Sequence, residues 1–300
     1  MKNKKGIWSF SDLKYKTQRK VIVFCFLFFP VLLLAVFSYL PLGRMIFYSF
    51  TDWDGMSREY SPVGIDNYKK IFTDSEQFAV LKVSVYYICG TFVQTVLALY
   101  FATILSFKVR FRNFFKAAIF FPYLINGVAI GFMFLLFYRA DGMLDTVLQF
   151  LGLGSLIQKW LGNPDVVNWS IVATSIWRYM GLMFVIFYGA IASISSEIYE
   201  AAEVDGANAW HKFIYIIFPG IRQVIFVNLT VNLSGALSIY EMPYIMTGGA
   251  NRSKTFLMNI LDTAFKYNKY GVASAMSVVL LIIILLTALF QKAVIGKEKV

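Results

Sequence analysis

Six runs of about 20 mostly apolar residues limit this chain to a helical membrane protein. Each run is long enough to cross a bilayer as an α-helix, and helices satisfy their own backbone polar groups in hydrocarbon. Only 15% of the 300 residues are charged, against about 25% in soluble domains, which excludes a soluble enzyme and a disordered chain. We therefore predict an all-α polytopic membrane protein with six transmembrane helices, near 21–42, 83–107, 117–137, 169–192, 213–240 and 271–291.

The distribution of basic residues predicts that both termini are cytoplasmic. With the N-terminus inside, the inner segments hold 15 Lys and Arg in 60 positions and the outer segments hold 11 in 100, which follows the positive-inside rule. We expect a basic cytoplasmic tail over 1–20, a membrane domain over 21–292 and a short cytoplasmic tail over 293–300. The first tail is expected to lie against anionic lipid headgroups, and it lacks the base-stacking aromatic surface of a nucleic-acid site.

Few residues are available for catalysis or for binding a metal. The two cysteines, Cys25 and Cys89, lie in apolar runs, and His211 is the one histidine. No disulfide framework or cysteine-based metal site is expected from such a set. The chain also has no GxxxxGK[ST] loop to hold the phosphates of ATP. We predict that it is not an enzyme and that it holds no cofactor or metal of its own.

The inner segment 191–212 departs from the basic pattern, because it has four acidic residues and one lysine. Ser195 or Ser196 is placed to cap a helix, Gly206 to end it, and Asp205 or Asn208 to cap the next one. The sequence therefore predicts a short helix–turn–helix on the cytoplasmic side. Helices that rest on lipid favour Lys and Arg on their polar face, so we favour docking into a basic groove of a partner protein over contact with lipid.

The spacing within this segment resembles the EAA loop of the membrane subunits of ABC importers. The family pattern is Glu-Ala-Ala, three residues, Gly, nine residues, Ile, one residue and Leu-Pro. This chain matches every spacing with Glu200-Ala201-Ala202, Gly206, Ile216 and Phe218-Pro219. The departure is Phe218 in place of Leu, which keeps the position apolar.

Three further stretches resemble outer loops of the carbohydrate-uptake branch of these permeases, the maltose or multiple-sugar type. They are VGIDNYKKIF at 63–72, DGMLDTVLQFLGL at 141–153 and YIMTGGANRSKTFLMNILDTAF at 244–265. Two positions depart from the branch: Ala250 replaces a common Pro, and Tyr240-Glu241 replaces a common Phe-Asp. Both departures bear on the choice of sugar and leave the resemblance to a transporter intact.

The resemblance implies a set of partners in a prokaryotic cell membrane. It implies a heterodimer with a second, homologous permease, two cytoplasmic ABC ATPases that carry ATP and Mg, and an extracytoplasmic solute-binding protein. In the family, the EAA helix fits a groove on the ATPase and couples its closure to movement of the spans. Carried over residue by residue within the coupling loop 193–219, the coupling positions are Glu200, Ala201, Ala202, Asp205, Gly206 and Ala207.

Polar residues within or next to the apolar runs are candidates for a solute pathway. A sugar needs amides and hydroxyls for its hydroxyl groups and aromatic faces for its apolar sides. Polar contacts between helices are the alternative role for each of them, and for Arg178 a structural ion pair is as plausible as a pathway role. The candidates are Asn126, Arg178, Asn228, Asn232, Ser234, Tyr240 and Glu241.

We therefore predict one permease subunit of an ATP-driven ABC importer that moves a sugar or oligosaccharide inward by alternating access. A permease of the same type for glycerol phosphate or a polyamine is the first alternative. A channel or secondary transporter is the second, although the spans show no charged rings, paired acids or inverted half-repeat.

Overall fold

The computed structural model describes residues 14–107 and 109–295, and the regular structure of these residues is helical apart from an isolated bridge between Thr51 and Pro62. The predicted all-α class is confirmed. Most of the predicted terminal tails, 1–20 and 293–300, lies outside the described residues. The α-helices are α1 (Tyr15–Leu34), α2 (Leu40–Tyr48), α3 (Asp66–Thr73), α4 (Ser75–Ser106), α5 (Arg112–Leu124), α6 (Gly127–Phe137), α7 (Met143–Phe150), α8 (Val167–Ala192), α9 (Ser196–Val204), α10 (Ala209–Lys212), α11 (Phe218–Leu237), α12 (Glu241–Thr247), α13 (Phe256–Leu261) and α14 (Tyr270–Ile295).

Five helical segments of the described chain are long and apolar enough to cross a membrane, and they correspond to five of the six predicted spans. The remaining predicted span, 117–137, is not one continuous helix. This run forms α5 and α6, which meet at an angle of 98°. The 13 residues of α5 extend about 20 Å, less than the roughly 30 Å hydrocarbon core, so α5 alone is too short to be a span. Counted as one bent pair, α5 and α6 give the sixth.

The break between α5 and α6 has a local cause. Ile125 and Asn126 both have extended backbone conformations, with ψ angles of 139° and 136°. The Asn126 side chain then caps α6 by accepting a hydrogen bond of 2.9 Å from the Val128 backbone N–H. An asparagine favours this position because its side chain replaces the missing helical partner of a first-turn N–H.

Two prolines within the long helices each follow a π-helical turn. Residues Ala35–Tyr39 precede Pro41, and residues Phe213–Ile217 precede Pro219. A proline ring clashes with the carbonyl four residues earlier and donates no hydrogen bond. In both helices that carbonyl lies in the wider π turn, which relieves the clash. The helices therefore continue through both prolines.

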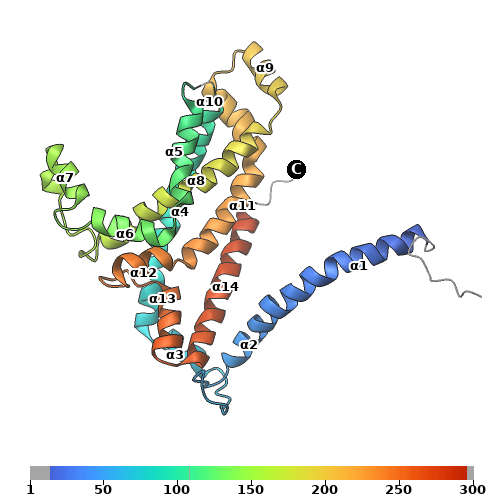
Figure 1. Cartoon of the computed structure of the whole chain (residues 1–300), viewed down its shortest axis with the longest axis vertical. Coiled ribbons are helices and arrows are strands. Elements are labelled where there is room, and N and C mark those ends of the chain that lie inside the picture. Colours follow the sequence, from blue (N-terminus) through green and yellow to red (C-terminus); the bar gives the residue numbers. More distant parts are fainter. Residues whose placement is uncertain (1–13, 108, 296–300) are drawn as a thin grey trace, which may run out of the picture.

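The core lies among α4, α8, α11, α12, α13 and α14, which pack side by side in Figure 1. Small residues allow the close approach of α4 and α8. A Cβ on Gly90 of α4 would lie 2.5 Å from Val172 of α8, and Ala98 and Ala102 are fully buried on the same helix. This packing gives the bundle one rigid wall that α4 and α8 form together.

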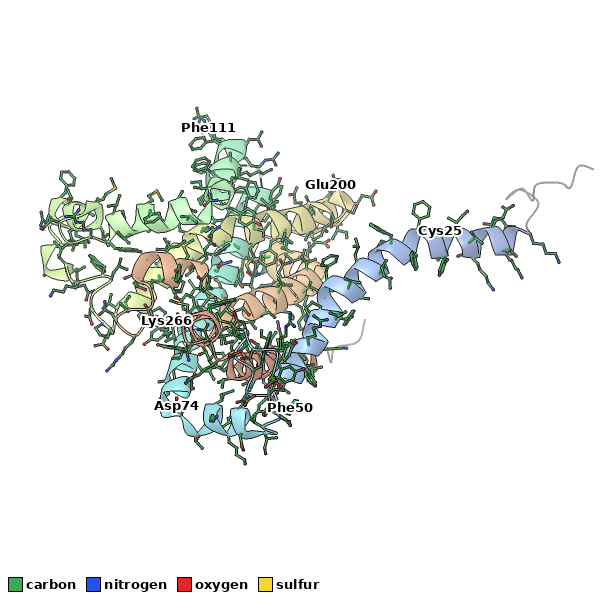
Figure 2. All side chains as sticks on the ribbon, turned by 60° about the horizontal axis from the view of Figure 1, so that its bottom comes forward. Cys25, Phe50, Asp74, Phe111, Glu200 and Lys266 are labelled. Atoms are coloured by element: carbon green, nitrogen blue, oxygen red, sulfur yellow. The ribbon has the colours of Figure 1, made fainter. Side chains whose placement is uncertain are left out.

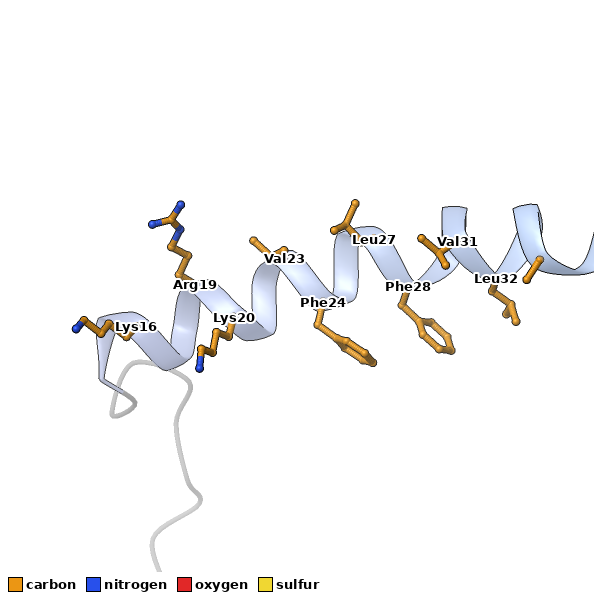
Figure 3. Close-up of a pocket in the computed structure, with 10 residues that line it drawn as sticks. Lys16, Arg19, Lys20, Val23, Phe24, Leu27, Phe28, Val31 and Leu32 are labelled. Carbon is orange, nitrogen blue, oxygen red and sulfur yellow. The ribbon is translucent and has the colours of Figure 1, made fainter. Parts of the chain in front are cut away.

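In the first helical segment α1 lies apart from this bundle, whereas α2 contacts α14. No residue from Tyr15 to Tyr48 is buried in the chain, and Figure 1 shows α1 extending away from the other helices. In Figure 3 the basic side chains of Lys16, Arg19 and Lys20 give way along the helix to apolar ones such as Val23 and Phe24. Such a sequence places the charges at a membrane surface and the apolar side chains within it.

Gly181 is expected to be essential for the packing of α8 on α5. A Cβ at this position would lie 2.5 Å from the Ile119 carbonyl oxygen and 2.9 Å from the Phe120 Cα. Because backbone atoms cannot move aside cheaply, we expect Gly181→Ala to destabilise the protein by about 1–3 kcal/mol. The thermal unfolding midpoint of the purified protein in detergent measures this change.

Gly189→Ala is the matched control, since Gly189 lies two turns further along α8 with no atom within 4 Å of a Cβ. This variant should keep or raise the midpoint, because alanine is the better helix residue. Equal midpoints for the two variants would show that close packing at Gly181 does not matter.

Candidate functional site

A cavity of about 460 Å³ lies among α4, α8, α11 and the start of α12. We call it the central cavity. Its wall combines apolar side chains with two glycines, Gly90 and Gly235, and with nine residues that carry hydroxyl, amide or carboxylate groups. These nine are Tyr87, Thr91, Gln94, Ser175, Tyr179, Asn232, Ser238, Tyr240 and Glu241. The cavity therefore offers hydrogen-bonding groups and aromatic rings together.

Three of the predicted pathway residues, Asn232, Tyr240 and Glu241, line the central cavity. Tyr240 stacks on Tyr244 with ring centroids 5.0 Å apart. The Asn232 amide donates to the Asn228 carbonyl at 2.8 Å, a bond that uses one amide hydrogen and leaves the side-chain oxygen for another partner. The structure thus brings an amide, an aromatic pair and a carboxylate to one site.

The other predicted pathway residues do not line the cavity. Asn126 caps α6, as described above. On α11, Asn228 donates to the Val224 carbonyl and Ser234 to the Thr230 carbonyl, both at 2.9 Å. These bonds satisfy polar side chains within their own helix, as is common for such residues in apolar surroundings.

Arg178 lies beside the cavity and pairs with Glu241. Its Nη1 is 2.5 Å from Glu241 Oε2, and the Tyr179 hydroxyl donates to the same oxygen at 3.3 Å. The pair joins α8 to α12, so of the two roles considered for Arg178 the structural ion pair is present. The Arg178 side chain is 13% exposed, whereas that of Glu241 is 39% exposed.

Gly127, the first residue of α6, makes room for this pair. A Cβ there would overlap both Glu241 Oε1 and Arg178 Nη1. The break between α5 and α6 therefore places a residue without a side chain against the charged groups. A glycine is required because the backbone itself approaches the pair.

The contribution of α4 to the cavity was not predicted from the sequence. Tyr87, Thr91 and Gln94 line it and are spaced by four and three residues, which is one face of a helix. Ser175 and Tyr179 on α8 show the same spacing of four. The Tyr87 hydroxyl is buried without a hydrogen-bond partner among the described residues, which is uncommon for a buried polar group. Helical spacing of these polar residues was the signal available in the sequence.

The predicted helix–turn–helix is confirmed as α9 and α10. The Ser195 hydroxyl accepts from the Glu197 N–H at 3.3 Å, and Asn208, rather than Asp205, caps α10 by accepting from the His211 N–H at 2.8 Å. Gly206 ends α9 with a φ of 76°. The Gly206 and Ala207 N–H groups donate to the Glu203 and Ala202 carbonyls, which is the Schellman arrangement of a helix end.

The outer face of α9 is open, whereas its inner face is fixed to the bundle. Glu200 is exposed, and Figure 2 shows its side chain pointing away from the body of the protein. On the inner face, the buried Lys212 pairs with Glu203 at 2.7 Å. Tyr199 packs against the core cluster that includes Ile217, and burial raises the pKa of its hydroxyl. The predicted coupling residues thus lie on a protruding segment that Tyr199 and the Glu203–Lys212 ion pair join to the bundle.

Residues 94–298 match the family model described as "Binding-protein-dependent transport system inner membrane component". This range is more than half of the chain. The chain belongs to this family. The predicted resemblance to permeases of binding-protein-dependent importers is therefore confirmed, and the permease is a multi-pass membrane protein.

Curated relatives agree with this assignment over nearly the whole permease. It is 32% identical to the probable ABC transporter permease protein YurN of Bacillus subtilis, covering 94% of this chain and 99% of the relative. It is 30% identical to the multiple sugar-binding transport system permease protein MsmF of Streptococcus mutans, covering 89% and 92%.

A solved structure shares the fold of the permease. A chain of a bacterial ABC transporter involved in import of the acidic polysaccharide alginate superposes with a TM-score of 0.81 and 18% sequence identity, covering 95% of this permease and 98% of that chain. The fold of this permease is therefore shared by a chain of a solved ABC importer.

Proposed function

We propose that this permease moves a sugar or oligosaccharide across the prokaryotic cell membrane by alternating access, as one subunit of an ATP-driven importer. The observation that carries this proposal is the composition of the central cavity. It brings the Asn232 and Gln94 amides, several hydroxyls and the rings of Tyr87, Tyr179 and Tyr240 to one cavity among the spanning helices. Amides and hydroxyls suit the hydroxyl groups of a sugar, and aromatic rings suit its apolar faces.

The names of relatives support a saccharide as the solute. Besides the multiple-sugar permease, they include a probable starch degradation products permease of Thermoanaerobacterium thermosulfurigenes, 29% identical, and an arabinooligosaccharides permease of Bacillus subtilis, 30% identical. Each covers 90% of this chain. A phosphate ester is disfavoured because Arg178, the cation next to the cavity, is already paired.

The proposed complex contains a second permease, two cytoplasmic ABC ATPases that bind ATP and Mg, and an extracytoplasmic solute-binding protein. Family membership supports the last of these partners by its description as binding-protein-dependent. The excess of Lys and Arg on one side supports cytoplasmic termini, and α9 then lies on the cytoplasmic side with the ATPases.

In this proposal Glu200, Ala201, Ala202, Asp205, Gly206 and Ala207 form the contact with an ATPase. Support comes from the exposed outer face of α9 and from the side chains that hold its inner face to the core, Tyr199 and Glu203. Through these contacts a displacement of α9 would pass to α10 and then to α11, since α10 and α11 are parts of one continuous helix. Closure of the ATPases would thereby move a wall of the central cavity.

The function is tested by reconstituting the permease in nanodiscs with its candidate ATPase and second permease. ATP turnover is measured with the binding protein and a panel of saccharides. Stimulation by a saccharide, lost in Glu200→Ala, is the expected result. Failure of the permease to bind any ATPase would contradict the proposal, and assembly without stimulation by any saccharide would assign it another solute.

Asn232→Ala is expected to weaken the response to saccharide. Its amide lines the cavity, and loss of one hydrogen bond to a bound solute costs about 0.5–1.5 kcal/mol. The saccharide concentration for half-maximal uptake should rise roughly 2- to 10-fold. Asn228→Ala is the control, because Asn228 makes the same bond to its own helix but does not line the cavity. If the two substitutions change the saccharide concentration for half-maximal uptake equally, Asn232 does not contribute to solute binding.

A further inference from the structure

We propose that the central cavity accepts uncharged saccharides and excludes acidic ones, and that Glu241 is the residue that determines this specificity. The inference rests on the proposed function and adds to it the charge of the solute.

The charge on the cavity wall comes from one residue. Among the described residues that line the cavity, Glu241 is the one acidic residue, and lysine and arginine do not occur there. A second hollow, of about 610 Å³, lies against the other side of Glu241 and is otherwise lined by Val128, Phe132, Tyr240, Tyr244, Ile245 and Gly248. An acidic solute in either space would meet a carboxylate and no basic lining residue.

The one arginine nearby is not available to a solute. Arg178 holds Glu241 at 2.5 Å and is the more buried partner, with 13% of its side chain exposed against 39% for Glu241. The pair is therefore oriented with its negative end toward the cavity and its positive end behind it. A solute carboxylate could reach the guanidinium only by displacing Glu241.

This orientation favours a ligand that donates hydrogen bonds. A carboxylate only accepts hydrogen bonds, and bonds from neutral hydroxyls to an ionised acceptor are stronger than those between neutral groups. Sugar hydroxyls are such donors, whereas the carboxylate of a uronic acid is not. Two like charges about 4 Å apart repel each other by roughly 4 kcal/mol near a protein surface, and the paired Arg178 lowers this repulsion because it lies behind the carboxylate. Glu241 thus attracts a neutral sugar and opposes an acidic one.

The charge preference of the cavity is tested without a saccharide by the reactivity of a cavity thiol. Ser238→Cys, on the cavity wall, is introduced together with Cys25→Ser and Cys89→Ser, which remove the two native cysteines. The assembled transporter is treated with methanethiosulfonates of similar size that carry a sulfonate, a hydroxyl or a trimethylammonium group. Mass spectrometry of the permease measures the rate at which each reagent modifies the thiol. Each rate is divided by the rate of the same reagent with Ser155→Cys, an exposed position in an outer loop.

The sulfonate reagent is expected to modify the cavity thiol at least about fivefold more slowly than the hydroxyl reagent. Because the reagents are compared on the same cysteine, a change in the ionisation of its thiol affects all of their rates equally and leaves the ratio of the rates unchanged. Glu241→Gln should reverse this order, because Arg178 then contributes an uncompensated positive charge. Arg178→Gln with Glu241→Gln should remove the preference. Equal rates for the sulfonate and hydroxyl reagents in the parent cavity would overturn the inference.

Transport distinguishes failure of this inference from failure of the proposed function. In the reconstituted importer, ATP turnover is measured with galactotriose and trigalacturonate, and with maltotriose and cellotriose as further neutral saccharides. Stimulation by a neutral trisaccharide alone supports the inference. Stimulation by trigalacturonate would overturn it and leave the proposed function standing. Stimulation by no saccharide, neutral or acidic, would overturn both.

Discussion

Gly206→Val is expected to reduce saccharide-driven uptake at least tenfold while the permease still inserts into the membrane. Gly206 has a φ of 76°, and a β-branched residue in this conformation is strained by about 1–3 kcal/mol. Relief of that strain opens the Schellman turn between α9 and α10 and moves the proposed contact with the ATPase. The measurements are uptake, saccharide-stimulated ATP turnover and the amount of ATPase that co-purifies with the permease.

Gly152→Val provides the matched control for this prediction. Gly152 has a φ of 73°, and like Gly206 it has no atom within 4 Å of a Cβ, so the substitution introduces the same backbone strain at a site after α7. Uptake should remain within about twofold of the parent. If both glycine variants lose transport equally, strain in general and not the turn at α9 is responsible. If neither loses it, the coupling role proposed for this turn is incorrect.

Gly127→Ala is expected to lower both stability and transport. The new methyl group would overlap the paired atoms of Arg178 and Glu241, so the pair has to separate or α6 has to move. Separating a buried pair costs about 3–5 kcal/mol, and we expect about 1–3 kcal/mol here, since the Glu241 side chain is 39% exposed. The thermal unfolding midpoint and the rate of uptake measure the two effects.

Gly235→Ala controls for the addition of a methyl group beside the same cavity. Gly235 lines the cavity on α11, and no atom lies within 4 Å of a Cβ there. The thermal unfolding midpoint of Gly235→Ala should match that of the unsubstituted permease. A midpoint for Gly127→Ala that also matches the parent would mean that the ion pair accommodates a side chain at this position.

Features that depend on residues close in sequence were predicted correctly. The apolar runs locate five continuous spans, and Ser195, Gly206 and Asn208 form the caps and turn of α9 and α10. Each of these features follows from side chains that bond to backbone groups within a few residues. Hydropathy and capping patterns therefore suffice for them.

Features that depend on distant residues were not predictable in the same way. The run 117–137 is apolar apart from Asn126, and its division into α5 and α6 is accompanied by contacts of Gly127 with Arg178 and Glu241. Likewise, the polar residues of α4 become a cavity wall only where α8 and α11 pack opposite them. Hydropathy gives no information on which helices meet, so these residues remained unassigned or had two possible roles.

The position of Gly127 implies an order of events in the assembly of the permease. The run 117–137 is apolar enough to enter the bilayer as one straight helix. The groups that occupy the space beside Gly127 come from α8 and α12, which are synthesised later. Their contacts with the α5–α6 break can form only once α12 has emerged and folded back. The contacts that fix the α5–α6 break against α8 and α12 are therefore completed late in synthesis, after the local cap by Asn126 can already form.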